Sequence, residues 1–103
     1  MKSVLKTLKQ GKDLLEKHGW IQGMMFRPHQ GFCAMGAINM QLISHIDYRT
    51  AIHALWVELP AGNYDESELS PHPIAQWNDA KGRTKEEVLA LYDKAIATEE
   101  AKV

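Results

Sequence analysis

Cys33 has the most nucleophilic side chain in this sequence, and it is the chain's only cysteine. It stands where a predicted hairpin meets the predicted start of a helix, and the positive end of a helix dipole can lower the pKa of a thiol. A nucleophilic thiol also needs a general base and a group that orients this base. The sequence offers the following candidates: His29, His53 or His72 as the base, Asp79 or Asn78 as the orienting group, and Gln30 as an oxyanion donor.

A second interpretation of Cys33 is structural. Free cysteines commonly pack as small apolar residues, and Cys33 lies between Phe32 and Ala34. Because the sequence does not show which side chains are adjacent in space, both interpretations remain open, and burial is the commoner outcome. A single cysteine also excludes an intramolecular disulfide and a Cys-rich zinc site, which agrees with a reducing compartment.

The five histidines raise the question of a metal site. His29 and Cys33 are four residues apart, and His45 and His53 share a helical region, but neither spacing matches a zinc signature. His18 and His45 fall near predicted helix C-termini, where an imidazolium complements the dipole. We therefore expect no metal and no cofactor.

The segment "AQWNDAKGRTKEEV" (residues 75–88) places cations around the start of a helix, a geometry that suits phosphate. Glu86 and Glu87 lie in the same first turn and compete for its free N–H groups. We therefore interpret the segment as a capped structural joint in which Asn78 and Asp79 bond the following backbone as an Asx-type turn. Asp79 and Arg83, which we expect to pair, are the residues of this segment to mutate first.

Three consecutive large apolar residues, Met24, Met25 and Phe26, fall on the predicted hairpin. Successive side chains of a strand point to opposite faces, so all three cannot face one core. Exposed Met-rich surfaces adapt to partners, and this makes the segment our best candidate for a binding surface. The alternative is a hairpin packed between helices, in which the three side chains are covered.

Hydrophobic periodicity supplies the elements that must position these residues. Apolar residues at helical spacing predict a first helix over residues 3–18, and the turn residues of "RPHQG" predict a small hairpin near residues 20–33. The helical pattern resumes at Ala34 with "AMGAINMQLISH", where Ala34, Met40 and Leu42 share a broad apolar surface. Asp47 is the expected N-cap of the next helix, in which Trp56 has the spacing of a core residue.

The rest of the chain reads as an acidic loop followed by two helical segments. Residues 61–73 form the loop, and Pro73 starts a short helical turn that points Ile74 and Trp77 inward. Thr84 and Glu87 form a capping box at the start of the last helix, and the tail 98–103 is expected to fray. The sequence therefore predicts a mainly α protein, a compact bundle of about four helices with a small β-hairpin near residues 20–33, as one domain over residues 1–103.

Charge is distributed unevenly along the 103 residues. Residues 1–50 hold seven Lys/Arg and three Asp/Glu, and residues 51–103 hold five and ten, for a net charge of −1. This polarity can steer a charged partner, but it falls short of the basic footprint of a dedicated DNA-binding domain. The chain has no apolar run of the roughly 20 residues that cross a bilayer, and its first residues do not read as a secretory signal. We expect a cytoplasmic protein with no membrane association.

Three segments, "HGWIQG", "FCAMGAI" and "IAQWNDAKGRTKEEVLAL", together resemble a family of small proteins encoded by bacteria and their phages, for which no function is established. The resemblance covers roughly residues 5–96. The Cys-x-x-Gly-Ala element and the Trp-Asn-Asp…Gly-Arg-Thr…Glu-Val spacing carry it. It implies a compact α-rich domain and an accessory protein of a phage or mobile element, and it transfers no catalytic residue.

Three hypotheses for the function follow from the sequence. The first is a non-enzymatic module that binds a protein partner or a second copy of itself through Met24, Met25 and Phe26, because no convergent catalytic set is visible. The second is a hydrolase or transferase that uses Cys33 with a histidine. The third, a nucleic-acid-binding regulator acting through the lysine-rich first helix, requires strongly salt-dependent binding, and we expect nucleic acid not to be the partner.

Overall fold

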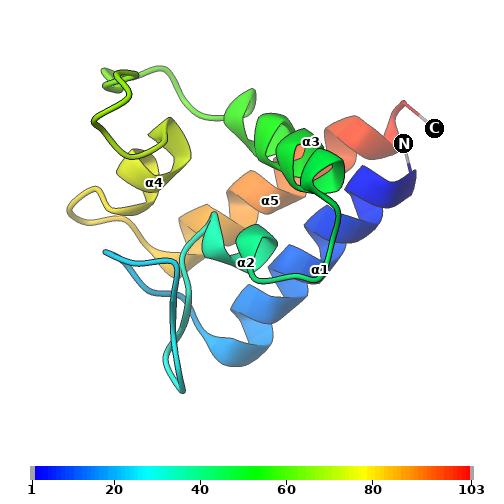
Figure 1. The fold of residues 1–103 in the computed structure, drawn as a ribbon, viewed down its shortest axis with the longest axis horizontal. Coiled ribbons are helices and arrows are strands. Elements are labelled where there is room, and N and C mark those ends of the chain that lie inside the picture. The colour runs from blue at the N-terminus through cyan, green and yellow to red at the C-terminus, as the bar shows by residue number, and fades with distance from the viewer. Residues whose placement is uncertain (1, 103) are drawn as a thin grey trace.

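In a computed structural model, which describes residues 2–102, the chain is mainly helical with one small antiparallel hairpin (Figure 1). Two long helices lie against each other, and the shorter elements cover them on one side. The elements of the described residues are, in chain order, α1 (Lys2–His18), β1 (Phe26–Arg27), β2 (Gly31–Phe32), α2 (Gly36–Asn39), α3 (His45–Trp56), α4 (Pro73–Asn78) and α5 (Lys85–Glu100).

One hydrophobic core joins these elements. The stripe predicted on the first helix is present, since Val4, Leu8 and Leu15 are fully buried. Tyr92 of α5 is also fully buried, and it packs so closely on α1 that a Cβ at Gly11 would lie 2.8 Å from its ring. Close approach therefore explains a glycine in the middle of α1, where it otherwise weakens a helix.

The middle of the chain differs from the predicted pattern. The helix that starts near Ala34 is only the single turn α2, and Met40 and Leu42 are exposed instead of facing the core. Ser44, and not Asp47, caps α3, because its hydroxyl accepts a bond from the backbone N–H of Asp47 at 3.1 Å. Four residues separate the end of α2 from Ser44, which starts a new helix as its N-cap, and the apolar spacing alone does not show this interruption.

Trp56 is a second correction. Its spacing predicted a core position, but its side chain is 39% exposed at the end of α3 and contacts the rings of His53 and His72. The α3 positions that do face the core are occupied by Ala51, Ile52, Ala54 and Leu55.

The last third of the chain follows the prediction more closely. Pro73 begins α4 at its first position, and Ile74 and Trp77 are buried. The capping box of Thr84 and Glu87 is present at the start of α5. This helix continues to Glu100, into the tail for which we predicted fraying. No helix within the described residues is long and apolar enough to cross a membrane.

The hairpin lies within the predicted range. Phe26 pairs with Phe32 and Arg27 with Gly31, and Pro28 and His29 form the turn, where His29 has a φ of 66°. Two further backbone bonds attach the hairpin to the end of α1: Phe32 N–H donates to Gly19 O at 3.1 Å, and Ile21 N–H donates to Phe32 O at 3.0 Å. The hairpin extends beyond the helices at the bottom of Figure 1, in cyan.

Candidate functional site

The base of the hairpin is held by the buried side chain of Asn78, at the end of α4. Its Oδ1 accepts from Trp20 Nε1 at 2.6 Å and from the backbone N–H of Ala34 at 2.9 Å. Its Nδ2 donates to Ile21 O at 3.1 Å and to Asp79 Oδ1 at 2.9 Å. One amide therefore connects all three sequence segments that carry the family resemblance. We call Asn78 with these four partners the Asn78 joint.

Two neighbouring side chains extend this joint. Gln22 Nε2 donates to the carbonyls of Asn78 and Ala80, both at 3.0 Å, and Asp79 Oδ1 also accepts from the backbone N–H of Gly23 at 2.9 Å. The prediction that Asn78 and Asp79 bond the following backbone as an Asx-type turn is therefore wrong. The partners of Asn78 other than Asp79 lie 44 to 58 residues away, and Asp79 Oδ1 accepts from Gly23 N and from Asn78 Nδ2. The predicted structural role of this segment is correct, but Asn78 joins segments that are distant in the sequence instead of forming a local turn.

Arg83 does not pair with Asp79 as we expected. Its Nε donates to Trp77 O at 2.8 Å, its guanidinium lies 4.2 Å from the centre of the Trp77 ring, and one terminal nitrogen lies 3.3 Å from Glu87 Oε2. Glu87 Oε1 in turn accepts from Thr84 N at 2.9 Å. The carboxylate of Glu87 thus takes the position that an anion would need at the start of α5, in agreement with a capped helix.

Cys33 is buried behind the hairpin with 4% of its surface exposed. Its Sγ accepts from Gly36 N at 3.2 Å and contacts Met25 Sδ at 3.7 Å. Burial raises the pKa of the Cys33 thiol, and the bond from Gly36 offsets this only in part. Among the described residues no histidine makes a hydrogen bond with the thiol, so the geometry gives the cysteine-dependent alternative no base.

We expect the Cys33 thiol to be inert in the folded protein. Because the thiolate is the reactive form and burial raises the thiol pKa, a disulfide reagent at pH 7.5 should modify native protein at least about 100-fold more slowly than protein in denaturant. The measurement is the rate of thiol modification against pH. Rapid labelling near neutral pH would show a thiolate and revive the enzyme hypothesis.

The candidate bases lie on separate elements. His29 is at the exposed tip of the hairpin, and His53 is on the exposed side of α3. His72 caps α4, where its Nδ1 accepts from Ile74 N at 3.0 Å. No group of three or more metal-binding side chains was found within residues 2–102.

His72 gives the fold a pH dependence. Burial lowers the pKa of His72, and nearby Glu66 opposes this shift. The unfolded chain therefore takes up a proton at a higher pH than the folded chain, so the stability that depends on neutral His72 is present above its unfolded pKa of about 6.5 and is lost as pH falls. We expect the free energy of unfolding to decrease from pH 7.5 to pH 5.5, as measured by urea denaturation.

The control for this prediction is His72→Asn, which replaces the Nδ1 acceptor at the N-cap with an amide oxygen and does not titrate in this range. Its stability should change less than that of the unsubstituted chain between the two pH values. Equal pH dependence of the two proteins would assign the effect to other groups.

The outer surface of the hairpin is apolar. Met24, Met25 and Phe26 are 44%, 36% and 36% exposed, so the alternative in which helices cover all three does not describe this chain. Their backbone is nevertheless clamped, because Cys33 N–H donates to Met25 O at 3.1 Å and a Cβ at Gly36 would lie 1.8 Å from that oxygen. The segment is therefore an ordered surface and not a loose loop.

Beside this surface lies a shallow cleft of about 440 Å³. Its apolar floor includes Phe26 and Phe32, whose ring centres are 5.0 Å apart, and the imidazole of His18 meets the Phe32 ring edge-on at 6.2 Å. We call it the hairpin cleft. Its lining residues are Leu14, Lys17, His18, Phe26, His29, Gly31 and Phe32.

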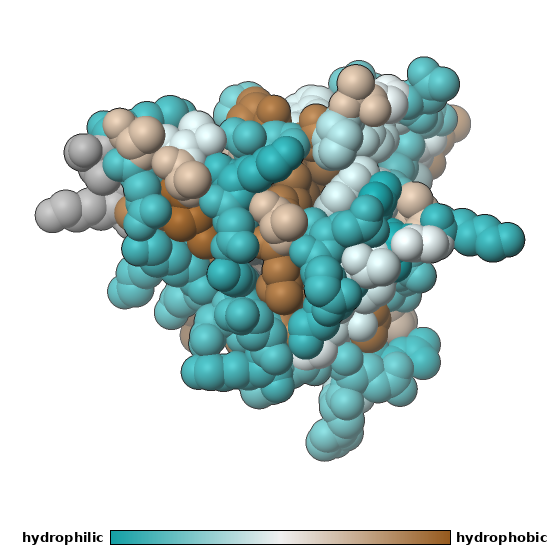
Figure 2. All heavy atoms as spheres, turned by 180° about the vertical axis from the view of Figure 1, so that it is seen from behind, coloured by the Kyte–Doolittle hydropathy of each residue, from teal (hydrophilic) through white to brown (hydrophobic). Residues whose placement is uncertain are grey.

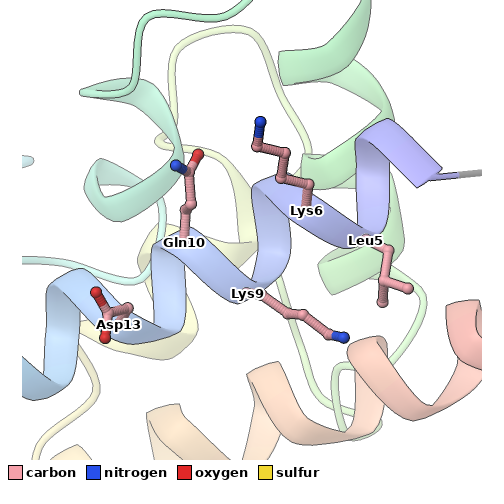
Figure 3. Close-up of a pocket in the computed structure, with 5 residues that line it drawn as sticks. All are labelled: Leu5, Lys6, Lys9, Gln10 and Asp13. Atoms are coloured by element: carbon pink, nitrogen blue, oxygen red, sulfur yellow. The ribbon is translucent and has the colours of Figure 1, made fainter.

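Two other parts of the surface are weaker candidates for a binding site. A depression of about 510 Å³ lies along α1 (Figure 3), but Leu5 and Lys9 extend toward α5 while Lys6 and Gln10 extend to the other side, so these side chains do not converge. The face seen in Figure 2 is mainly hydrophilic, with hydrophobic residues as a narrow band among charged ones.

The lysines of α1 are largely engaged in ion pairs. Lys9 pairs with Glu100 at 3.2 Å, and Lys12 pairs with Asp93 at 2.6 Å. Lys17 lies 3.1 Å from Asp13. A phosphate backbone would have to compete with these carboxylates, which leaves the nucleic-acid hypothesis without support from this helix.

Fold and surface together define a small α-rich domain that presents an ordered apolar hairpin, with no assembled catalytic set among the described residues. The chain belongs to a family of unknown function, DUF6197, whose model matches residues 1–98. This confirms an uncharacterised family over nearly the whole chain, while the specific motifs and the phage origin remain predictions. No match was found among curated proteins or among solved structures.

Sequence reasoning did not identify the partners of Asn78. Trp20, Ile21 and Gln22 have no feature in the sequence that assigns them to a joint with α4. The only available signal was the presence of glycines on both sides of Trp20 and before Phe32, since glycines at such positions indicate positive φ or close backbone approach.

Proposed function

We propose that this chain is a non-enzymatic protein-binding module that acts through the hairpin surface formed by Met24, Met25 and Phe26. The observation that carries this proposal is the combination of three partly exposed large apolar side chains with a backbone clamped beneath them. An ordered surface loses little conformational entropy on binding, so more of the contact free energy remains for affinity. Flexible methionine side chains adapt to the shape of a partner.

The arrangement of the Asn78 joint supports this proposal. The joint lies at the base of the hairpin, on the side that faces the helices, and all its hydrogen bonds are internal to the chain. Its role is then to hold the hairpin in position, and the binding contacts are left to the exposed side chains. The family resemblance extends the proposal to an accessory protein of a phage or mobile element that works in the bacterial cytoplasm.

A displayed peptide library selected on the purified chain tests the surface without knowledge of the natural partner. Peptides selected on the unsubstituted protein should bind the double variant Met24→Ser/Phe26→Ser at least about 10-fold more weakly, because central apolar anchors carry most of the affinity of such contacts. The matched control is Met40→Ser/Ile46→Ser, which removes apolar side chains of 47% and 74% exposure elsewhere on the molecule. This control should retain affinity within about twofold.

Two results would contradict the proposal. Selected peptides that bind the hairpin variant as well as the unsubstituted protein would place binding elsewhere. Failure to enrich any peptide would remove the evidence for a binding surface. Thermal melting of both variants establishes that the substitutions leave the fold intact.

A further inference from the structure

Two surfaces of this chain carry opposite charge. Residues 17–46, which contain the hairpin, hold two Lys/Arg, three histidines and no Asp or Glu. Residues 50–78, which contain the loop between α3 and α4, hold four Asp/Glu, two histidines and no Lys or Arg. The next acid, Asp79, lies at the base of the hairpin, where it accepts from Gly23 N. Complementary potentials of this kind guide two surfaces together and select their orientation.

The loop between α3 and α4 contains an ordered turn, residues 65–70, which we call the acidic turn. The carboxylate of Asp65 accepts from Ser67 N at 2.9 Å and from Ser70 Oγ at 2.6 Å, and these bonds lower the pKa of Asp65. Gln76 of α4 anchors the turn, because its Oε1 accepts from Asp65 N at 2.9 Å. The fold therefore presents this turn in one conformation.

The acidic turn displays a side chain that the fold does not use. Leu69 is 99% exposed, and Glu66 and Glu68 are exposed beside it. One exposed leucine is ordinary on a protein surface. Leu69, however, lies on a turn that internal hydrogen bonds hold, with glutamates beside it. The acidic turn therefore presents one apolar side chain surrounded by negative charge, which suits binding to an apolar cleft with a cationic rim.

The hairpin cleft has the complementary chemistry. Its floor is apolar, and its rim carries Lys17 and imidazoles. Asp13 neutralises part of the Lys17 charge. Arg27 follows Phe26 on the same hairpin and does not line the cleft itself; its Nε lies 3.3 Å from Met24 Sδ, and it makes no ion pair within residues 2–102. Acidic side chains approaching this surface would therefore meet an available cation.

The two surfaces cannot meet within one chain. In Figure 1 the hairpin projects at the bottom of the molecule, and the loop that contains the acidic turn lies at the top. A contact between them requires two molecules. Each molecule then offers its hairpin to one neighbour and its acidic turn to another, so that association is head-to-tail and leads to a ring or an open chain.

We infer that the hairpin cleft binds the acidic turn of a second copy of this chain, with Leu69 against the Phe26 and Phe32 rings and the glutamates of the turn facing Arg27. The inference rests on the proposed function and names the partner of the same surface.

Charge reversal on each surface tests the inference by sedimentation velocity of the full chain from about 10 μM to about 1 mM, a range that covers weak, transient contacts. The unsubstituted chain should show an average mass that rises with concentration. Glu66→Lys/Glu68→Lys and Lys17→Glu/Arg27→Glu should each weaken association at least about 10-fold, and more salt should weaken it in the unsubstituted chain. An equimolar mixture of the two variants should associate again, because each turn then meets a cleft of opposite charge.

Leu69→Ser with Leu42→Ser as its matched control tests the apolar contact, since both leucines are fully exposed. Only Leu69→Ser should weaken association. A monomer at all concentrations, an oligomer insensitive to both charge reversals, or a mixture that fails to associate would overturn the inference. If self-association fails in one of these ways but library peptides still bind at the hairpin, the proposed function stands without the further inference. If neither self-association nor peptide binding is seen, both proposals are wrong.

Discussion

Replacing Gly31 with alanine should destabilise the protein by about 3 to 5 kcal/mol, as measured by urea denaturation. Gly31 has a φ of +127°, and a Cβ at this position would lie 2.1 Å from the carbonyl oxygen of Gly19. That oxygen accepts the bond from Phe32 N that attaches the hairpin to the end of α1. Because the backbone of residue 31 fixes the position of the Cβ and the oxygen belongs to the backbone of Gly19, no side-chain rotation can relieve the contact, and the hairpin must move away from the helix.

Gly23→Ala separates the clash from the cost of the backbone angle. Gly23 also has a positive φ, of +87°, but a Cβ there would meet no atom within 4 Å. This variant should lose only about 1 to 2 kcal/mol, the cost of the left-handed backbone region for a residue with a Cβ. Similar losses in the two variants would mean that the approach of Gly19 and Gly31 does not constrain the hairpin.

Asn78→Asp should cost about 2 to 4 kcal/mol at pH 7, although it changes the side chain by a single group. The amide nitrogen of Asn78 donates to Ile21 O and to Asp79 Oδ1. A carboxylate would place an oxygen against both acceptors in a position with no exposed surface. The loss should become smaller toward pH 4, because a protonated carboxyl can again donate one bond. The measurement is the difference in unfolding free energy between variant and unsubstituted chain at each pH.

Asp79→Asn is the matched control for this prediction. It also exchanges a carboxylate and an amide, but on an exposed residue whose Oδ1 can still accept from Gly23 N. We expect a change below about 1 kcal/mol. If Asn78→Asp were tolerated as well as this control, the Asn78 joint would not hold the hairpin in position.

The two predictions also bear on the proposed function. If the joint and the Gly19–Gly31 approach position the hairpin, then variants that loosen it should bind selected peptides more weakly even where the exposed side chains are unchanged. Binding loss in Asn78→Asp, measured at a temperature where the variant is still folded, would connect the three segments joined by Asn78 to the hairpin surface. These segments would then contain residues that position the hairpin.

Much of the fold was predictable because the relevant interactions are local. Three predicted features are present: the apolar stripe of α1, the proline at the start of α4, and the capping box of Thr84 and Glu87. Each depends on pairs of residues that are no more than four positions apart in the sequence. The errors also have local causes. Ser44 competes with Asp47 as a cap, and an apolar spacing that continues past the end of α3 assigned Trp56 to the core.

The candidate site was predictable only in part. The pleat of a strand favoured partial exposure of Met24, Met25 and Phe26 but left a hairpin covered by helices as an alternative, and of the three only Phe26 lies in a strand. The fate of Cys33 was not predictable, because its burial depends on which residues of the hairpin and α2 close over it. The separation of the histidines from the thiol is likewise a property of the packed chain.

The sequence by itself therefore determined the helical class, the capping box of α5, the uncharacterised family and the apolar hairpin segment, since each follows from neighbouring residues or from a matching pattern. Tertiary structure alone decided that Asn78 joins Trp20, Ile21 and Ala34 across 44 to 58 residues, that Arg83 stacks on Trp77, and that the acidic turn and the hairpin lie on opposite sides of the molecule. The physical reason is that a buried amide must form hydrogen bonds with whichever groups the packing of the whole core brings close to it. The number of residues between two groups in the sequence does not show how far apart they lie in the folded chain.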